Sequence, residues 1–235
     1  MCRPGRFRYP VASRIMRIGL FGGTFNPVHY GHLRVALEVC EEFYLDVCYL
    51  IPSSDPPHKT AHDLAPAEDR VAMIHSAIAD TACFQVSDAE IARSGLSYTI
   101  DTVRHFQSTM SSPGELFLIM GCDAFLELHT WKSVDMLLET IPLIVMNRPA
   151  GNTEGPDRKG IKTYLNTHVR GGNYRYSESD SGFLDPKKPP IFLFDVTQLD
   201  ISSTDIRNRA RDGRSLQYLV PDSVDAYIAE KGLYR

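Results

Sequence analysis

Long apolar stretches are missing from this 235-residue chain, and so is an excess of charge of either sign. No run approaches the ~18 apolar residues that a membrane-spanning helix needs. With 25 Lys+Arg against 29 Asp+Glu the net charge is -4, which argues against a general nucleic-acid or membrane-surface binder. A small anionic ligand is still allowed, because it needs positive charge only locally. Ordinary shares of hydrophobic (43%) and charged (23%) residues exclude full-length disorder and collagen-like repeats.

Cysteine is scarce and scattered: the five residues form no C-x-x-C pair, and their number is odd. We therefore expect no disulfide framework and a reducing, cytoplasmic compartment. The first 17 residues hold five arginines and no acid, but they lack the apolar region of a secretory signal. A transit peptide and a disordered basic extension over residues 1–15 both fit this composition. We favour the extension, because Met16 directly precedes the first strand-like run.

Short apolar runs alternate along the chain with stretches of helical period. The predicted strands are 17–21, 47–51, 84–86, 116–120, 143–146 and 191–196. The predicted helices are 33–44, 68–79, 98–110, 134–140, 203–211 and 223–230, the last with Asp222 as N-cap and Gly232 as its stop. Apolar strands separated by helices indicate a parallel sheet covered on both faces. We predict a doubly wound α/β fold that binds ligands at the carboxyl ends of its strands.

Residues 151–190 break this pattern. Six glycines and four prolines make up a quarter of the segment, which also holds a polar tract over 177–181. Such a composition cannot offset its ordering entropy by burial, so we expect a long loop or partly ordered insertion. The rest of 16–235 is expected to form a single domain around it. A lid, an interface element and an inert surface insertion all fit this segment.

The first predicted strand runs into the sequence GGTFNPVHYGH, residues 22–32, just before a helix. Glycines let a phosphate approach the backbone, and a helix N-terminus supplies free N–H groups and a positive dipole end. His29 and His32, three residues apart, lie on one face of the first turn, and Gly31 leaves room for a ligand. A metal site and two incidental histidines are the alternatives, although no third metal ligand stands at suitable spacing.

Other phosphate-binding and nucleophile motifs are absent, among them GxxxxGK[ST], GxGxxG after a strand, and GxSxG. A second candidate site lies at ISSTDIR, residues 201–207, where a strand again leads into a helix. One hydroxyl there is the expected helix cap, but three hydroxyls and Arg207 exceed what capping needs. Hydroxyls, N–H groups and a guanidinium together predict a polyphosphate cradle.

In combination, GGTFNPVHYGH and ISSTDIR resemble the nucleotidyltransferase superfamily of the HxGH type. Members share a Rossmann-like domain that joins ATP to a phosphate monoester and releases pyrophosphate. Within the superfamily the chain is most similar to bacterial nicotinate-nucleotide adenylyltransferases. The supporting stretches are PPHK at 56–59, SYTIDT at 97–102, GCD at 121–123 with Trp131 ten residues after the glycine, and YLVPDSVDAYIAEKGLY at 218–234. The resemblance covers about residues 16–150 and 191–235; the 151–190 insertion and the 1–15 extension depart from it.

This resemblance implies roles by position. The catalytic residues would be His29, His32, Lys59 and Arg207, all of them contacting phosphates of ATP. ATP would be bound by Gly22, Gly23, Thr24, Phe25, Gly31, Ile201, Ser202, Ser203 and Thr204. Nicotinate mononucleotide would be bound by Thr99, Asp123, Trp131 and Lys132. Backbone N–H groups near Thr99 and Lys132 would meet its carboxylate, Asp123 its ribose and Trp131 its ring. Mg²⁺ would arrive bound to the ATP phosphates, without a dedicated set of protein ligands.

From the residues alone, several of these assignments have simpler alternatives. Trp131 also fits a core position, Asp123 a helix N-cap, and Lys59 a solvated loop. His58 and His62 fit the surface better than a metal site. Arg70 and Arg148 fit either phosphate binding or a structural role.

The expected function is adenylyl transfer from ATP to nicotinate mononucleotide, giving nicotinate adenine dinucleotide and pyrophosphate in NAD biosynthesis. An adenylyltransferase for nicotinamide mononucleotide or another phosphate monoester is the alternative within the class. A non-catalytic nucleotide-binding protein is the alternative outside it. The expected partners are the two small-molecule substrates, with no nucleic acid and no membrane. The sequence leaves open whether the chain forms a homo-oligomer.

Overall fold

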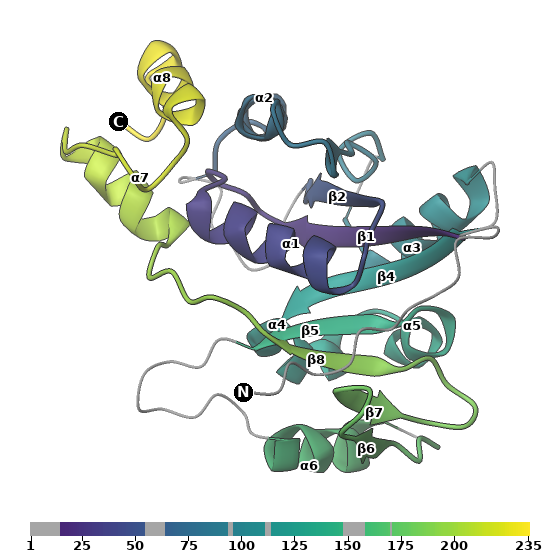
Figure 1. The fold of residues 1–235 in the computed structure, drawn as a ribbon. Helices are drawn as coiled ribbons and strands as arrows, with labels where there is room; N and C mark the ends of the chain where they lie inside the picture. Colours follow the sequence, from purple (N-terminus) through teal and green to yellow (C-terminus); the bar gives the residue numbers. More distant parts are fainter. Residues whose placement is uncertain (1–14, 55–63, 94–95, 111–113, 148–157, 170) are drawn as a thin grey trace.

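The computed structural model describes residues 15–54, 64–93, 96–110, 114–147, 158–169 and 171–235 (Figure 1). Its centre is an eight-stranded sheet with the strand order β3-β2-β1-β4-β5-β8-β7-β6. The parallel strands are β1 (Met16–Gly23), β2 (Val47–Pro52), β3 (Phe84–Val86), β4 (Gly114–Gly121), β5 (Leu143–Asn147) and β8 (Ile191–Asp195). All six were predicted from the sequence, and the predicted parallel sheet is confirmed.

Helices cover both faces of this sheet, each over its own core cluster. One face carries α1 (Tyr30–Glu42), α2 (Ala67–Ile78), α7 (Ser203–Arg211) and α8 (Asp222–Lys231). The other carries α3 (Thr99–Thr109), α4 (Cys122–Leu126), the 3-10 turn η2 (Leu128–Thr130), α5 (Val134–Thr140) and α6 (Arg158–His168). The fold is therefore doubly wound, as predicted.

Alternation along the strands divides the core between the two faces. In β4, Phe117 and Ile119 join the cluster beneath α1 and α2, while Leu118 and Met120 join the cluster beneath α3 and α5. Successive strand residues point to opposite faces, and here both faces are covered. This is why the buried strands are apolar throughout, the pattern from which a parallel sheet was predicted.

The chain changes direction across the sheet between β1 and β4. β1 pairs with β2 on one side and β4 on the other, but β1 leads into α1 on one face and β4 into α4 on the opposite face. In open α/β sheets the crevice at such a switch point, outside the carboxyl ends of the strands, is where ligands bind. Gly22-Gly23 and Gly121 lie at these two strand ends.

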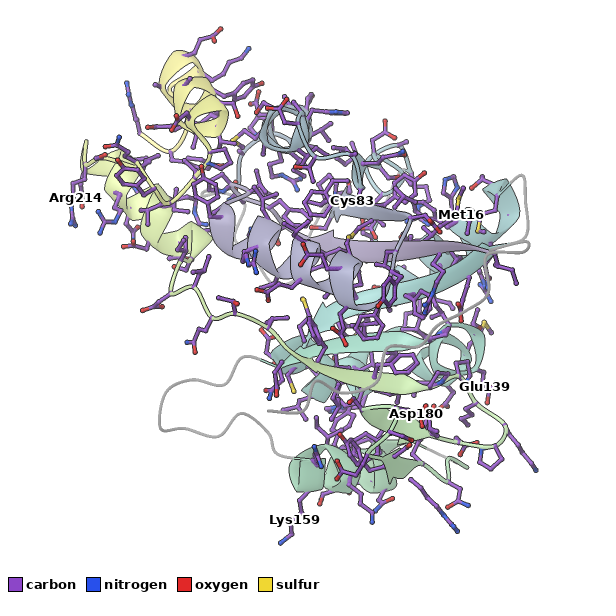
Figure 2. The ribbon with its side chains drawn as sticks, in the orientation of Figure 1. Met16, Cys83, Glu139, Lys159, Asp180 and Arg214 are labelled. Atoms are coloured by element: carbon purple, nitrogen blue, oxygen red, sulfur yellow. The ribbon has the colours of Figure 1, made fainter. Side chains whose placement is uncertain are left out.

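Of the two interpretations of 151–190, a long loop and a partly ordered insertion, the long loop is wrong for the described part of that segment. It contains α6 and an antiparallel hairpin of β6 (Arg175–Ser177) and β7 (Gly182–Leu184), which extends the sheet beyond β8. Ile161, Leu165 and Phe183 are buried in the core. The average composition concealed these few apolar residues at helical and strand spacing. Figure 2 places Lys159 of α6 far from Arg214, which follows α7.

The ends of α8 test two further predictions. Asp222 is the first residue of the helix rather than its N-cap, which is Pro221, so that prediction is wrong by one position. Gly232 adopts the left-handed conformation with φ 64° and ends the helix, as predicted. In the residues that the structure describes, no helix combines the length and apolarity needed to cross a membrane.

Candidate active site

The loop after β1 is tightly packed on one side and open on the other. Phe25 has a φ of 48°, in a region that bulky residues rarely adopt, and its ring is buried against the rings of Phe21 and His32. A Cβ on Gly23 would come within 3.0 Å of that ring, whereas a Cβ on Gly22 would meet nothing within 4 Å. Only the backbone of Phe25 is thus left for the predicted contact with ATP, because its ring belongs to the core.

His29 and His32 lie together at the start of α1. Their rings are stacked with centroids 3.7 Å apart, and Phe25 supports His32 edge-on at 5.0 Å. His29 is the N-cap residue and is 4% exposed. A Cβ on Gly31 would lie 3.0 Å from the His29 ring, so this glycine makes room for the histidine. The structure thus brings together the two histidines that the spacing placed on one face.

Some of the N–H groups predicted to be free at this helix start are not. The Tyr30 amide donates to the Leu219 carbonyl at 3.1 Å, and the His32 amide donates to the His29 carbonyl at 2.9 Å. The prediction fails for these donors because a segment almost 190 residues later packs against the helix start, and because the first turn closes on itself. Anion binding here must depend more on the side chains.

The second motif meets the first at this point. Ser203 Oγ donates to the Pro27 carbonyl at 3.0 Å, and Arg207 Nη1 donates to the Asn26 carbonyl at 3.0 Å. The position of a Cβ on Gly31 lies 3.6 Å from the Ile201 carbonyl oxygen. The loops at 22–32 and 201–207, distant in sequence, therefore form one site, as the polyphosphate interpretation requires.

The three hydroxyls of the second motif do different things. Ser202 is the N-cap of α7 and accepts from the Asp205 amide at 3.1 Å, and Ser203 ties the two loops. Thr204 is exposed, and its Oγ1 accepts a weak 3.4 Å hydrogen bond from Arg207 Nη2. Arg207 is buried, and its Nε has no hydrogen-bond partner among the described residues. A buried donor without a partner is costly, which favours an acceptor supplied by a ligand.

Arg70, which sequence reasoning left between two roles, is structural. It is 1% exposed, and its guanidinium donates to the carbonyls of Ala65, Thr24, Ser53 and Ser54 at 2.7–3.2 Å. Burial lowers its pKa, while the negative charge of Glu68, and of Tyr234 when ionised, acts in the opposite direction. An arginine remains charged even so. Its four bonds fasten the loop after β1 to the loop after β2.

Two buried arginines bring positive charge to the loop after β1. Neither Arg70 nor Arg207 forms an ion pair with a carboxylate in the part of the chain that the structure describes. Both are held by neutral carbonyl groups instead. Two buried guanidiniums with neutral partners leave a local positive potential, although the whole chain carries a net charge of -4.

Of the residues predicted to hold the second substrate, Thr99 lies at the start of α3, and Trp131 and Lys132 lie between η2 and α5. Lys132 Nζ lies 4.0 Å from the ring centroid of Tyr98, which directly precedes Thr99, and forms an ion pair with Asp101 at 3.2 Å. Thr99 is half-buried. Trp131 is also half-buried and packs on the core, so its partial burial fits both the core and the stacking interpretation.

Asp123 is exposed in the first turn of α4, whose N-cap is Gly121. The N-cap interpretation of Asp123 is therefore wrong. A Cβ on Gly121 would lie 2.4 Å from the carboxylate of Asp123, so the glycine leaves space for it at the end of β4. This carboxylate is free of a capping duty and lies at the edge of the sheet where ligands bind.

Two hydrogen-bonded contacts connect the segment before α3, next to Thr99, with the loop after β1, which is predicted to bind phosphate. The Ser54 amide donates to Ser97 Oγ at 3.2 Å, and Arg70 holds both the Ser54 and the Thr24 carbonyls. Lys59, His58, His62 and Arg148 lie outside the described residues, so the predictions for them stay predictions. In the described part no group of three or more His, Cys, Asp or Glu side chains is suited to a metal ion.

Sequence reasoning missed two residues of this site. Asn26 is 2% exposed, and its Oδ1 accepts from the Ala65 amide at 3.0 Å and from the Tyr234 hydroxyl at 2.8 Å. A polar residue between Phe25 and Pro27 inside a phosphate-loop motif was the available signal. Tyr234 lies in the C-terminal stretch that resembles the family's ending, but no local pattern tells which residue it contacts.

Comparison with known proteins agrees with the family that the two sequence motifs resemble. A family model described as cytidylyltransferase-like matches residues 20–209. The chain is 41% identical over 221 residues to a protein of Desulfatibacillum aliphaticivorans named "Probable nicotinate-nucleotide adenylyltransferase", covering 93% of this chain and 100% of the relative. A Pseudomonas putida protein of the same name is 39% identical over 224 residues, covering 95% and 93%.

The fold has solved counterparts. Plasmodium falciparum nicotinic acid mononucleotide adenylyltransferase complexed with NaAD superposes with a TM-score of 0.69 at 16% identity, covering 93% of this chain and 97% of that one. At this identity the likeness concerns the fold alone. It confirms the Rossmann-like α/β architecture.

Proposed function

The chain belongs to the nicotinate-nucleotide adenylyltransferase family, within the cytidylyltransferase-like group, and from that premise we propose that it transfers the adenylyl group of ATP to nicotinate mononucleotide. The products are nicotinate adenine dinucleotide and pyrophosphate, a step of NAD biosynthesis. The proposed partners are these small molecules, without nucleic acid, and the proposed compartment is the cytoplasm.

One observation carries the proposal for the site. The two predicted phosphate-binding loops meet through Arg207 and Asn26, next to the stacked rings of His29 and His32. A polyphosphate between them would give the buried Arg207 Nε an acceptor.

The proposed chemistry needs no general base. A phosphate oxygen of the mononucleotide, already anionic at neutral pH, attacks the α-phosphorus of ATP, and the bond from that phosphorus to the β-bridging oxygen breaks. Pyrophosphate leaves with the electron pair. His29, His32 and Arg207 stabilise its growing negative charge, and the packed loops hold the reacting groups in line. Lys59 is expected to add a further cation, and Mg²⁺ enters as part of the MgATP substrate.

Selectivity for nicotinate would arise at the start of α3. The carboxylate of nicotinate can accept hydrogen bonds from backbone N–H groups near Thr99 and Lys132, at the positive end of a helix dipole. The amide of nicotinamide would turn its own NH₂ toward those donors and leave groups unpaired. Trp131 would stack on the pyridine ring, and Asp123 would bond the ribose hydroxyls.

One assay tests this function. Pyrophosphate release is measured from ATP with nicotinate mononucleotide, nicotinamide mononucleotide or phosphopantetheine at matched concentrations. We expect release that is fastest with nicotinate mononucleotide. Equal rates with the two mononucleotides would remove the proposed selectivity. ATP binding without release from any acceptor would favour a non-catalytic nucleotide-binding protein instead.

A further inference from the structure

The chain's C-terminal end returns to the active site. After α8, Gly232 takes the left-handed conformation and the Leu233 amide donates to the Ile228 carbonyl at 3.1 Å, which reverses the chain. Leu233 and Tyr234 then pack against the core cluster shared by α1, α2 and α7. In Figure 1 the C-terminus lies between α8 and α7.

Tyr234 reaches the loop after β1, residues 24–29, which we call the catalytic loop, through one hydrogen bond. Its hydroxyl donates to Asn26 Oδ1 at 2.8 Å, and the same oxygen accepts from the Ala65 amide at 3.0 Å. The main-chain carbonyl of Asn26 accepts from Arg207 Nη1. Asn26 thus receives donors from three distant segments, and three residues later in its own loop stands His29.

The Tyr234 hydroxyl is also electrostatically suited to this task. Burial raises its pKa, and the charges of Arg207 and Arg70 act in the opposite direction. The hydroxyl stays neutral at physiological pH and can donate, which a tyrosinate could not. It is therefore a neutral donor placed near two buried cations that it does not neutralise.

A second contact from the C-terminal part supports the same loop. The Leu219 carbonyl accepts from the Tyr30 amide at 3.1 Å, at the first residue of α1. The segment from 219 onward thus holds the catalytic loop at Asn26 and the residue after the loop, Tyr30, on either side of His29. Such double anchoring determines where the His29 ring lies relative to Arg207.

We propose that Tyr234 is a positioning residue for adenylyl transfer. Through the Asn26 side chain it fixes the position of residues 26–29 relative to Arg207. The histidines and the guanidinium then face the same phosphates. Tyr234 touches neither substrate itself. This inference rests on the function proposed above.

The chain contains a matched control. Tyr227 of α8 donates its hydroxyl to Asp69 Oδ1 at 2.8 Å, the same distance as the Tyr234 bond, but this bond ties α8 to α2. Tyr227→Phe therefore removes the same atom and a bond of the same length without touching the catalytic loop. Tyr234→Phe keeps the ring and its packing, so both variants are expected to fold.

The test measures kcat, both KM values and the melting temperature for wild type, Tyr234→Phe and Tyr227→Phe. We expect Tyr234→Phe to lower kcat about tenfold with both KM values within about twofold of wild type, since misplaced groups cost most in the transition state. Tyr227→Phe should keep kcat, although both variants lose a hydrogen bond and some thermal stability with it. A similar kcat in Tyr234→Phe and wild type would overturn the positioning role, and so would an equal loss of kcat in the two variants. Absence of pyrophosphate release by wild type would instead overturn the proposed function, and the positioning role with it.

Discussion

Replacing Arg70 by methionine tests whether one buried guanidinium holds the two substrate loops together. Methionine fills much of the same volume but donates no hydrogen bond. The substitution strands the carbonyls of Thr24, Ser53, Ser54 and Ala65, which Arg70 contacts at 2.7–3.2 Å. Only the Ala65 bond is fully buried, so water can reach part of the others.

The expected loss of stability follows from these four bonds. Hydrogen bonds to a charged group contribute about 1.5–3 kcal/mol each, or about 6–12 kcal/mol for four. Desolvation of the guanidinium offsets several kcal/mol of that, in agreement with the lowered pKa of Arg70. Partial hydration of the stranded carbonyls reduces the loss further. We expect the free energy of unfolding to fall by about 3–5 kcal/mol, a large share of the typical total.

Urea unfolding at neutral pH, followed by fluorescence and circular dichroism, measures this loss. Arg209→Met is the control, because the Arg209 side chain makes a surface i,i+4 pair with Asp205 at 2.8 Å, where about 0.3–0.5 kcal/mol is at stake. Arg70→Lys should lie between, since a single ammonium cannot reach four carbonyls. A loss below about 1 kcal/mol in Arg70→Met would refute the structural role and return Arg70 to the candidates for phosphate binding.

Two further predictions concern the histidines and the thiols. His32→Ala should lower kcat by at least about a hundredfold while changing the KM for the mononucleotide far less, because the ring acts on the departing pyrophosphate; near-normal turnover in steady-state assays would remove that role. Burial, and to a lesser extent Asp123, raises the pKa of the Cys122 thiol from 9.0 to about 11. The unfolded thiol therefore loses its proton first, and the free energy of unfolding should decline as the pH rises from about 9 to about 11. Urea titrations across that range should show a shallower decline in Cys122→Ala, and an unchanged slope would contradict the buried thiol.

Much of the fold follows from local patterns. The six parallel strands and helices α1, α2, α3, α5, α7 and α8 were all predicted within a few residues, because apolar periodicity reports which face of an element is covered. The short α4, the 3-10 turn η2, the helix α6 and the hairpin of β6 and β7 were not predicted. Strands of three residues are too short for a periodic signal, and only their pairing with β8 makes them strands.

The candidate site, like the fold, could be predicted from the sequence only in part. The sequence pointed to His29, His32 and Arg207 through residue types and spacing, and the structure places them around one loop. It could not distinguish the two roles of Arg70, because a phosphate-binding and a carbonyl-binding arginine look alike until their acceptors are known. It also assigned free N–H groups to a helix start whose Tyr30 amide is already taken by Leu219.

By itself the sequence determined the α/β class, the two phosphate-loop motifs and the resemblance that led to an adenylyltransferase. These are properties of short segments, where periodicity and side-chain chemistry can be read directly. Only the tertiary structure decided which donors already have a partner and which, such as Arg207 Nε, have none among the described residues. The bonds from Arg207 and Tyr234 to Asn26 span 181 and 208 residues of sequence, and no local pattern specifies such partners. They form because the doubly wound sheet brings the ends of distant strands and the C-terminal segment to the same edge.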